Sequence, residues 1–199
     1  MIDTPTLAGT HVRLEPMTRG SAAALLEAAN ADRSTYDLTR VADSVEEMQQ
    51  YVDRALSDQA AGTVVPFVVV ATSTGNVVGT TRFLDIECWP EPQWPQPTVV
   101  EIGHTWLARA VQRTAVNTEM KYLMLRHAFE HWGVLRVTLK TDARNERSRA
   151  AILRIGATFE GVRRVAVVAS DGGVRDSAYF SIVADEWPSV ERSLAAKLG

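Results

Sequence analysis

The sequence contains a single cysteine, Cys88, among its 199 residues. One cysteine cannot form an intrachain disulfide or a cysteine-based metal site, so we expect a reducing, cytoplasmic environment. A cysteine protease or transferase would also need a cysteine–histidine arrangement, and none accompanies Cys88. Disulfide-stabilised secreted domains and cysteine-dependent enzymes are therefore disfavoured.

Long hydrophobic runs and targeting signals are also missing. The longest apolar run, Val64–Ala71, has eight residues, which is too short to span a bilayer. The segment from Met1 to Thr6 has neither a basic n-region nor an apolar h-region of a signal peptide. We therefore expect a soluble intracellular protein with no membrane partner.

The chain has no excess of positive charge. It carries 21 Lys and Arg against 24 Asp and Glu, a net charge of −3, whereas nucleic-acid-binding domains are usually basic. We therefore expect no nucleic-acid partner. The hydrophobic fraction of 46% is ordinary for globular proteins and is enough for a sizeable core. No repeat or linker divides the sequence, which predicts one domain over residues 1–199.

Hydrophobic periodicity predicts alternating strands and helices. Ser44 with Glu47 forms a capping-box pattern before an apolar helical face. Gly133 and Gly156 are expected to end two later helices. The order β-α-α-β-β-β-α-β-α-β-β predicts an α/β fold with a mixed sheet. Strands are expected at 11–16, 64–71, 77–86, 99–107 and 135–141 and on both sides of the turn 170–173, and helices at 21–29, 44–56, 117–132, 145–155 and after 185.

A polar loop between a strand and a helix, within residues 101–121, is the most informative segment. Successive backbone N–H groups at such a junction bind anions, and the helix dipole reinforces the attraction. Arg109, Arg113 and Lys121 add positive charge around it. The segment predicts a phosphate or pyrophosphate site, and the alternative is an ordinary turn with solvated arginines.

Residues 112–117 in this segment resemble motif A of the GCN5-related N-acetyltransferase (GNAT) family, Gln/Arg-x-x-Gly-x-Gly/Ala. Gln112 matches the first position, whereas Ala115 and Asn117 replace the two small positions. Glycine permits backbone conformations that alanine and asparagine resist, so the loop departs from the family pattern there.

A second segment resembles the next strand and helix of the same family. Asn145 and Ser148 match an Asn-x-x-Ser helix start. From the residues alone, Asn145 is an N-cap and Ser148 lies in the first turn. The resemblance implies that Asn145 contacts the pantetheine arm of the cofactor and that Ser148 lies near its sulfur.

The resemblance extends over residues 7–187 and is nearest to the branch of the RimJ/RimL ribosomal-protein N-terminal acetyltransferases. It implies a single-domain GNAT-like fold, with a mixed, mostly antiparallel central sheet flanked by helices and strands splayed at the acyl-CoA site. The segments that carry this likeness are 7–16, 101–103, 145–148, 160–163 and 175–181.

The activity implied is transfer of an acetyl group from acetyl-CoA to a primary amine of a protein N-terminus or a small molecule. The attacking ammonium must first lose a proton. Glu101 is the first candidate base, with Asp85, Glu87 and His104 as alternatives. Ser148 or Tyr179 is expected to protonate the leaving thiolate.

The resemblance also implies a set of cofactor contacts. A backbone N–H near Trp106 or Leu107 is expected to stabilise the oxyanion, and Asn145 and Ser148 are expected along the pantetheine arm. No metal is expected, because His127 and His131 lie one helical turn apart without a third ligand. The pyrophosphate is expected at Gln112, Arg113, Thr114, Ala115, Val116, Asn117 and Thr118.

Two other interpretations stay open from the sequence. The substituted glycines are compatible with a non-catalytic acyl-CoA-binding module, and an enzyme using another acyl-CoA, such as succinyl-CoA, has the same pattern. The sequence does not name the acceptor amine. A homodimer could form through the terminal strands and helix.

Overall fold

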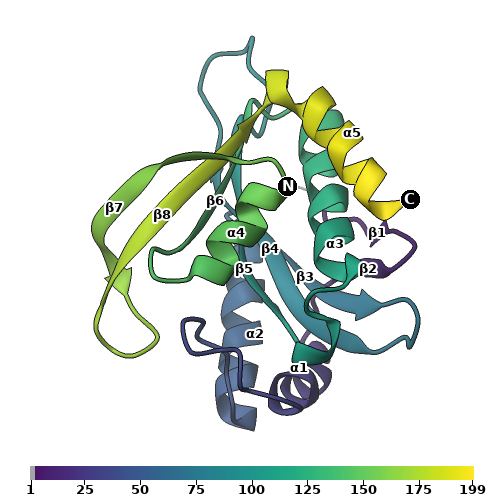
Figure 1. Ribbon diagram of the computed structural model, residues 1–199, viewed down its shortest axis with the longest axis vertical. Helices are drawn as coiled ribbons and strands as arrows, with labels where there is room; N and C mark the ends of the chain where they lie inside the picture. Colours follow the sequence, from purple (N-terminus) through teal and green to yellow (C-terminus); the bar gives the residue numbers. More distant parts are fainter. Residues whose placement is uncertain (1–2) are drawn as a thin grey trace.

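One twisted sheet of eight strands runs through the computed structural model, which describes residues 3–199 (Figure 1). The strand order is β1-β2-β3-β4-β5-β6-β8-β7, and every neighbouring pair is antiparallel except β5 with β6. The sheet is therefore mixed and mostly antiparallel, as predicted. The strands are β1 (Leu7–Ala8), β2 (Val12–Pro16), β3 (Val65–Ala71), β4 (Val77–Glu87), β5 (Val99–Leu107), β6 (Arg136–Asp142), β7 (Thr158–Val168) and β8 (Val174–Val183).

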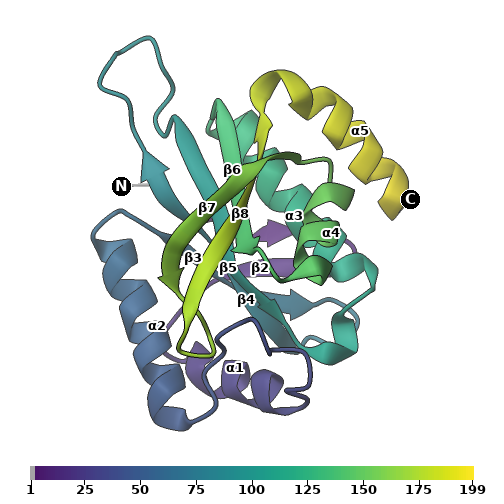
Figure 2. The same cartoon turned by 60° about the vertical axis from the view of Figure 1, so that its left-hand side comes forward.

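Helices cover both faces of this sheet (Figure 2). Helices α1 and α2 lie on one side, and α3, α4 and α5 lie on the other. Of residues 3–199, no helical stretch is both long and apolar enough to cross a membrane. The helices are α1 (Ser21–Asn30), α2 (Val45–Ala60), α3 (Ala115–Arg126), α4 (Glu146–Arg154) and α5 (Trp187–Leu198), with a π-helical turn at His127–His131 and 3-10 turns at Arg109–Val111 and Ala184–Glu186.

Strand β3 shows why the longest apolar run of the sequence is continuous. Phe67 and Val69 pack into the cluster that holds α3, α4 and α5, whereas Val68 and Val70 pack against α1 and α2. Successive side chains of a strand point to opposite faces, so a strand covered on both faces must be apolar at every position. Strand β3 therefore lies between the two hydrophobic cores and contributes side chains to both.

The local capping signals are confirmed in most places. Ser44 Oγ accepts a hydrogen bond from the Glu47 N–H at 3.2 Å, so Ser44 caps α2 as predicted. Gly133 and Gly156 adopt φ of 68° and 98° just after their helices, a conformation that glycine reaches without steric cost.

Helix α2 runs past its predicted end at residue 56 to Ala60, and both ends of α3 differ from the prediction. Helix α3 begins at Ala115 rather than Asn117, because Thr114 Oγ1 accepts from the Val116 N–H at 3.3 Å and caps the helix earlier. Its regular part ends at Arg126, and the chain continues through a π-helical turn to His131. The strand β1 was not predicted, since two residues are too few to show an alternation.

Candidate active site

Strands β5 and β6 separate beyond Glu101. Their parallel register covers only three residues of each strand, and its last pair is Glu101 with Thr138. Strand β5 continues to Leu107 and keeps its contact with β4, so the opening lies between β5 and β6. The register of β5 against β4 is irregular between Gly103 and Trp106, a stretch that contains His104 at φ +48°. The expected splay of two strands is present.

Glu101 lies at the vertex of this opening. Its side chain is buried, with the residue 3% exposed, and its Oε2 lies 2.8 Å from the Lys140 Nζ. Burial raises the pKa of Glu101 to about 6, the nearby Asp85 carboxylate adds to the rise, and Lys140 opposes it. A carboxyl group with a pKa near neutrality suits a general base.

Lys140 bridges two carboxylates across the opening. Its Nζ also lies 3.1 Å from Asp85 Oδ2. Burial alone would lower the pKa of Lys140, but Glu101 and Asp85 reverse that effect and raise it above its usual value. Lys140 therefore stays protonated and holds both carboxylates at one end of the opening.

A hollow of about 230 Å³ adjoins this cluster. Glu101 and Tyr179, two of the three predicted catalytic residues, line it together with the alternative bases Asp85 and Glu87. Tyr179 comes from β8, where it pairs with Lys140 of β6. Ser148, the third predicted residue, is not among the residues that line this hollow. The carboxylates would attract a cationic amine.

His104 lies on β5 outside that lining. The residue as a whole is exposed, but the surrounding protein desolvates its imidazole, and this desolvation lowers the pKa of His104 to about 4. The charges of Arg82 and Lys140 lower that pKa further. The imidazole is therefore neutral near pH 7. His104 can therefore accept a proton, but it does not line the hollow with the carboxylates.

The far end of β5 directs a backbone donor toward the opening. Ala108 donates its N–H to the Val78 carbonyl at 2.7 Å, on the β4 side. Because N–H directions alternate along a strand, the Leu107 N–H points to the opposite side, where β6 has diverged. The predicted oxyanion donor at Leu107 thus has a suitable direction. By the same alternation, the Trp106 N–H, the other predicted donor, points toward β4, where Trp106 pairs with Thr80.

The loop that follows is held by Gln112. Its Nε2 donates to the Leu107 carbonyl at 2.9 Å and to Thr35 Oγ1 at 2.9 Å. The left-handed conformation in this loop belongs to Arg113, at φ +62°, whereas Ala115 and Asn117 lie in the first turn of α3. The two substituted motif positions therefore need no glycine conformation in this chain, which removes the predicted difficulty.

The start of α3 has backbone donors in the predicted place, with one qualification. The first N–H groups of a helix have no partner within the helix. The Val116 N–H already bonds to Thr114 Oγ1, and the Thr118 N–H is positioned to bond within the helix. The N–H groups of Ala115 and Asn117 are the better anion donors of the predicted set.

A second hollow, of about 400 Å³, lies beside this helix start. Thr114, Ala115 and Val116 line it from the predicted loop. Thr10 and His11, from the turn before β2, and residues of the β3–β4 hairpin line its other side. No sequence pattern joins these segments, so the sequence could not have identified them.

Asn145 caps α4 as predicted. Its Oδ1 accepts from the Ser148 N–H at 3.0 Å, and the residue is 8% exposed. The cap uses only the oxygen of the side-chain amide, so the NH₂ group is free for another role. Ser148 lies in the first helical turn and is half-buried.

Lys140 is the main site residue that sequence reasoning missed. It lies on a predicted strand, and its position two residues after Thr138 places it on the same face as that residue. A basic residue alternating with buried Leu139 and Thr141 was the available signal. Within residues 3–199, no group of three or more His, Cys, Asp and Glu side chains is arranged to hold a metal.

Comparisons with known proteins cover most of the chain. Residues 11–158 match the model of the acetyltransferase (GNAT) domain. The Bacillus subtilis protein YdaF, whose name proposes a ribosomal N-acetyltransferase, is 32% identical over 87 residues. That match covers 44% of this chain and 46% of YdaF, so it spans less than half of that curated relative.

Solved structures match over a greater length. A proposed acetyltransferase from T. thermophilus is 32% identical, with a TM-score of 0.83 over 100% of both chains. Mycobacterium smegmatis RimJ, solved in complex with CoA-disulfide, gives a TM-score of 0.77 at 23% identity, over 96% of this chain and 91% of RimJ. At 23% identity, the likeness to RimJ shows a shared fold alone.

Proposed function

The chain belongs to the acetyltransferase (GNAT) family, and from this membership we propose that it transfers the acetyl group of acetyl-CoA to the primary amine of a protein N-terminus. The name of YdaF, a proposed ribosomal N-acetyltransferase, favours a protein acceptor over a small amine. We propose the cytoplasm as its location. The observation that carries the proposed chemistry is Glu101, buried at the vertex of the β5–β6 opening with a raised pKa.

In the proposed reaction, Glu101 takes a proton from the acceptor ammonium, directly or through one water. The amine nitrogen then attacks the thioester carbonyl, and a tetrahedral oxyanion forms. The Leu107 N–H, on the side where β6 has diverged, donates to that oxygen. Collapse breaks the carbon–sulfur bond, and the amide nitrogen loses its second proton to solvent. The thiolate takes a proton from Ser148 or Tyr179, and that hydroxyl regains a proton from solvent.

The acyl donor is proposed to bind along the start of α3 and the start of α4. The N–H groups of Ala115 and Asn117 and the positive end of the α3 dipole suit the pyrophosphate. The amide NH₂ of Asn145 is free to contact the pantetheine arm while its oxygen caps α4. RimJ, which shares this fold, was solved in complex with CoA-disulfide, and that supports a CoA ligand for a fold of this kind.

Release of free CoA in the presence of amine acceptors tests the proposed function. Purified protein should release CoA from acetyl-CoA when peptides with free N-termini are added, and mass spectrometry should find one acetyl group on the peptide. N-terminally blocked peptides are the matched control. Binding of acetyl-CoA without turnover on any acceptor would favour the non-catalytic module instead. Succinyl-CoA, tested beside acetyl-CoA, separates the two acyl donors.

The proton donor to the thiolate needs its own comparison, because the two candidates lie in different places. Tyr179 lines the hollow with Glu101, whereas Ser148 lies beside Asn145 at the start of α4. Tyr179→Phe and Ser148→Ala should be assayed with acyl donors of differing thiol pKa. Loss of the true acid should slow the poorer leaving group more, and an equal loss for all donors indicates positioning.

The predicted homodimer stays a prediction. Strand β7 forms one edge of the sheet (Figure 1). It carries exposed apolar side chains, including Val165 and Val168. Light scattering coupled to size-exclusion chromatography measures the oligomeric state directly.

A further inference from the structure

Arg82 on β4 is a buried cation without a partner. The residue is 4% exposed, and its Nε and Nη2 are buried with no hydrogen-bond partner among the described residues. Its guanidinium carbon lies 4.9 Å from the centre of the Tyr51 ring, so the group is stacked on α2. The Tyr51 hydroxyl is also buried without a partner among those residues. Two neighbouring buried polar groups are thus left unsatisfied.

The unpartnered atoms of Arg82 form one side of the guanidinium fork. The same pair of atoms binds a carboxylate elsewhere in this chain. In Arg144, Nε donates to Asp142 Oδ1 at 3.1 Å and Nη2 donates to Asp142 Oδ2 at 2.8 Å. In Arg13, both atoms donate to Glu15 Oε1. This edge of an arginine matches the two oxygens of a carboxylate, which is the partner it suits best.

Arg82 faces the same side of the sheet as the proposed base. It pairs with Gly103 of β5, and Glu101 lies two residues from Gly103 on the same face. A Cβ at Gly103 would lie 2.6 Å from Glu101 Oε1, so Glu101 lies directly over the glycine opposite Arg82. On the other side, the Arg82 charge acts on His104. Arg82 is therefore one cross-strand position from the proposed reaction centre.

A buried, unpaired guanidinium destabilises the folded protein unless an anion joins it. Resting on the proposed function, we infer that Arg82 determines acceptor specificity by binding a carboxylate of the acceptor beside its reacting amine. The carboxylate has two sources: an acidic side chain at the start of a protein N-terminus, or the α-carboxylate of a free amino acid. The proximity of Arg82 to Glu101 favours a carboxylate within the first two residues.

Matched acceptors separate these sources. One arm compares peptides that differ only by Asp or Asn at position 2, and the other compares serine with its α-carboxamide. We expect the wild-type protein to favour the carboxylate in one arm by about 10- to 100-fold in kcat/KM, the scale of hydrogen bonds to a charged group. Arg82→Met should reduce that ratio to about 1 while the neutral acceptor of the pair is still acetylated.

Arg13→Met is the matched control, since the Arg13 fork already binds Glu15 on β2. It should keep the wild-type ratio. Arg82→Met should melt at the wild-type temperature or above it, because it removes an unpaired buried charge. A purely structural arginine would instead lower the melting temperature and leave the ratio unchanged.

The inference is overturned if the wild type shows no carboxylate preference in either arm, or if Arg82→Met keeps the preference. Calorimetry of the acidic and neutral peptides, with CoA present, separates it from the proposed function. If nothing is acetylated but the acidic peptide binds more tightly in an Arg82-dependent way, the proposed function fails and the carboxylate site stands. Equal binding of both peptides, or binding independent of Arg82, overturns the site.

Discussion

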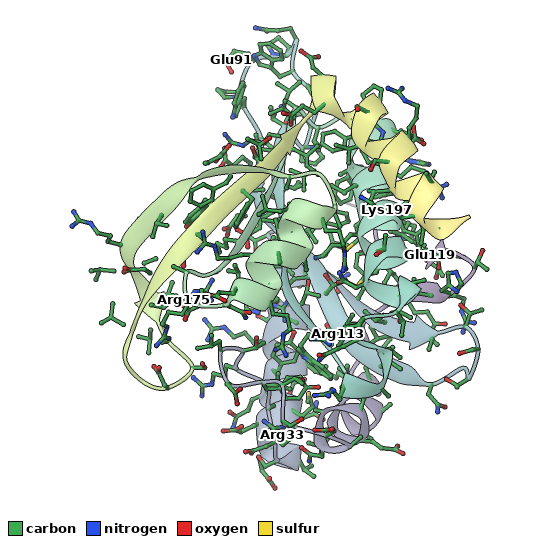
Figure 3. All side chains as sticks on the ribbon, in the orientation of Figure 1. Arg33, Glu91, Arg113, Glu119, Arg175 and Lys197 are labelled. Carbon is green, nitrogen blue, oxygen red and sulfur yellow. The ribbon has the colours of Figure 1, made fainter. Side chains whose placement is uncertain are left out.

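Two buried glutamates, Glu101 on β5 and Glu119 on α3, lie in opposite kinds of environment. They are 3% and 6% exposed. Glu119 accepts hydrogen bonds from three consecutive backbone N–H groups, those of Thr10, His11 and Val12, with Thr10 at 2.8 Å and Val12 at 2.9 Å. Figure 3 shows Glu119 beside the first strands of the sheet. Glu101 has one cationic partner and a second carboxylate nearby, and it borders a hollow.

The difference lies in how completely each carboxylate is satisfied. The backbone encloses Glu119 so closely that a Cβ at Gly9 would lie 2.5 Å from its Cδ. Those contacts join the turn between β1 and β2 to α3, a structural role. Glu101 shares one lysine with Asp85 and borders a hollow. Because it has few donors, burial raises its pKa. Burial alone therefore does not identify a reactive carboxylate. The two glutamates are distinguished by the number of hydrogen-bond donors around each carboxylate, which is smaller at Glu101.

The strongest test of this contrast is Glu101→Gln, which keeps the shape and removes the charge. Loss of a general base should lower kcat by about 10²–10⁴-fold, while the melting temperature should stay close to that of the wild type. Glu87→Gln, in the same hollow, should have a much smaller effect. An unchanged kcat and pH profile in Glu101→Gln would move the assignment to Asp85, Glu87 or His104.

Glu119→Ala should show the opposite pattern. It leaves three backbone N–H groups without their acceptor, which should lower the free energy of unfolding by about 3 kcal/mol or more. Folded protein should keep most of its kcat. Urea unfolding measures the first effect. Gly9→Ala should destabilise the wild type through its clash with Glu119 and cost less in the Glu119→Ala background. A Glu119→Ala protein of normal stability would show that these bonds contribute little.

Helix α3 carries Glu119 near its middle and the proposed pyrophosphate donors at its start, so the two roles can be separated. Ala115→Pro places proline at the first helical position, which helices accept, after Thr114 in an extended conformation. It removes one N–H and should weaken CoA binding by about 1–3 kcal/mol, measured by calorimetry. Ala115→Gly keeps the N–H and should bind normally. Equal CoA affinity in both variants would place the pyrophosphate elsewhere.

Asn145 combines the two kinds of role in one side chain. Asn145→Asp keeps the capping oxygen and should keep the melting temperature, since both residues cap helices well. It loses the NH₂ donor, so the KM for acetyl-CoA should rise by about tenfold, the scale of one hydrogen bond. An unchanged KM would leave Asn145 with the capping role alone. Steady-state kinetics and thermal melting make the two measurements.

The smallest expected effect is the pH dependence of stability. The pKa of Glu101 is about 6 in the folded protein, above the usual 4.5, so the folded state binds this proton more tightly than the unfolded state. Its contribution to stability is fully present below about pH 4.5 and is lost as the pH rises through 6. The advantage of the wild type over Glu101→Gln should shrink across that interval in urea unfolding at several pH values. A constant difference between the two proteins would contradict the raised pKa.

The sequence predicted the elements well because the signals for most of them are local. Within residues 3–199, alternating and helical periodicity marked seven of the eight strands and all five helices. The caps at Ser44 and Asn145 are formed by the residues that predicted them. The errors were local too. The cap at Thr114 was missed, and β1 was too short to show a period.

The sequence by itself determined the family, the element order and the candidate positions Glu101, Asn145 and Gln112, because each depends on neighbours within a few residues. Only the tertiary structure decided what these groups contact. Lys140 meets Glu101 and Asp85 because β6 runs beside β5 and then diverges from it. Arg82 is left without an acceptor among the described residues because Tyr51 of a distant helix covers it and its cross-strand neighbour is a glycine. Charge, burial and unsatisfied donors arise from contacts between segments far apart in the chain, and no local pattern encodes them.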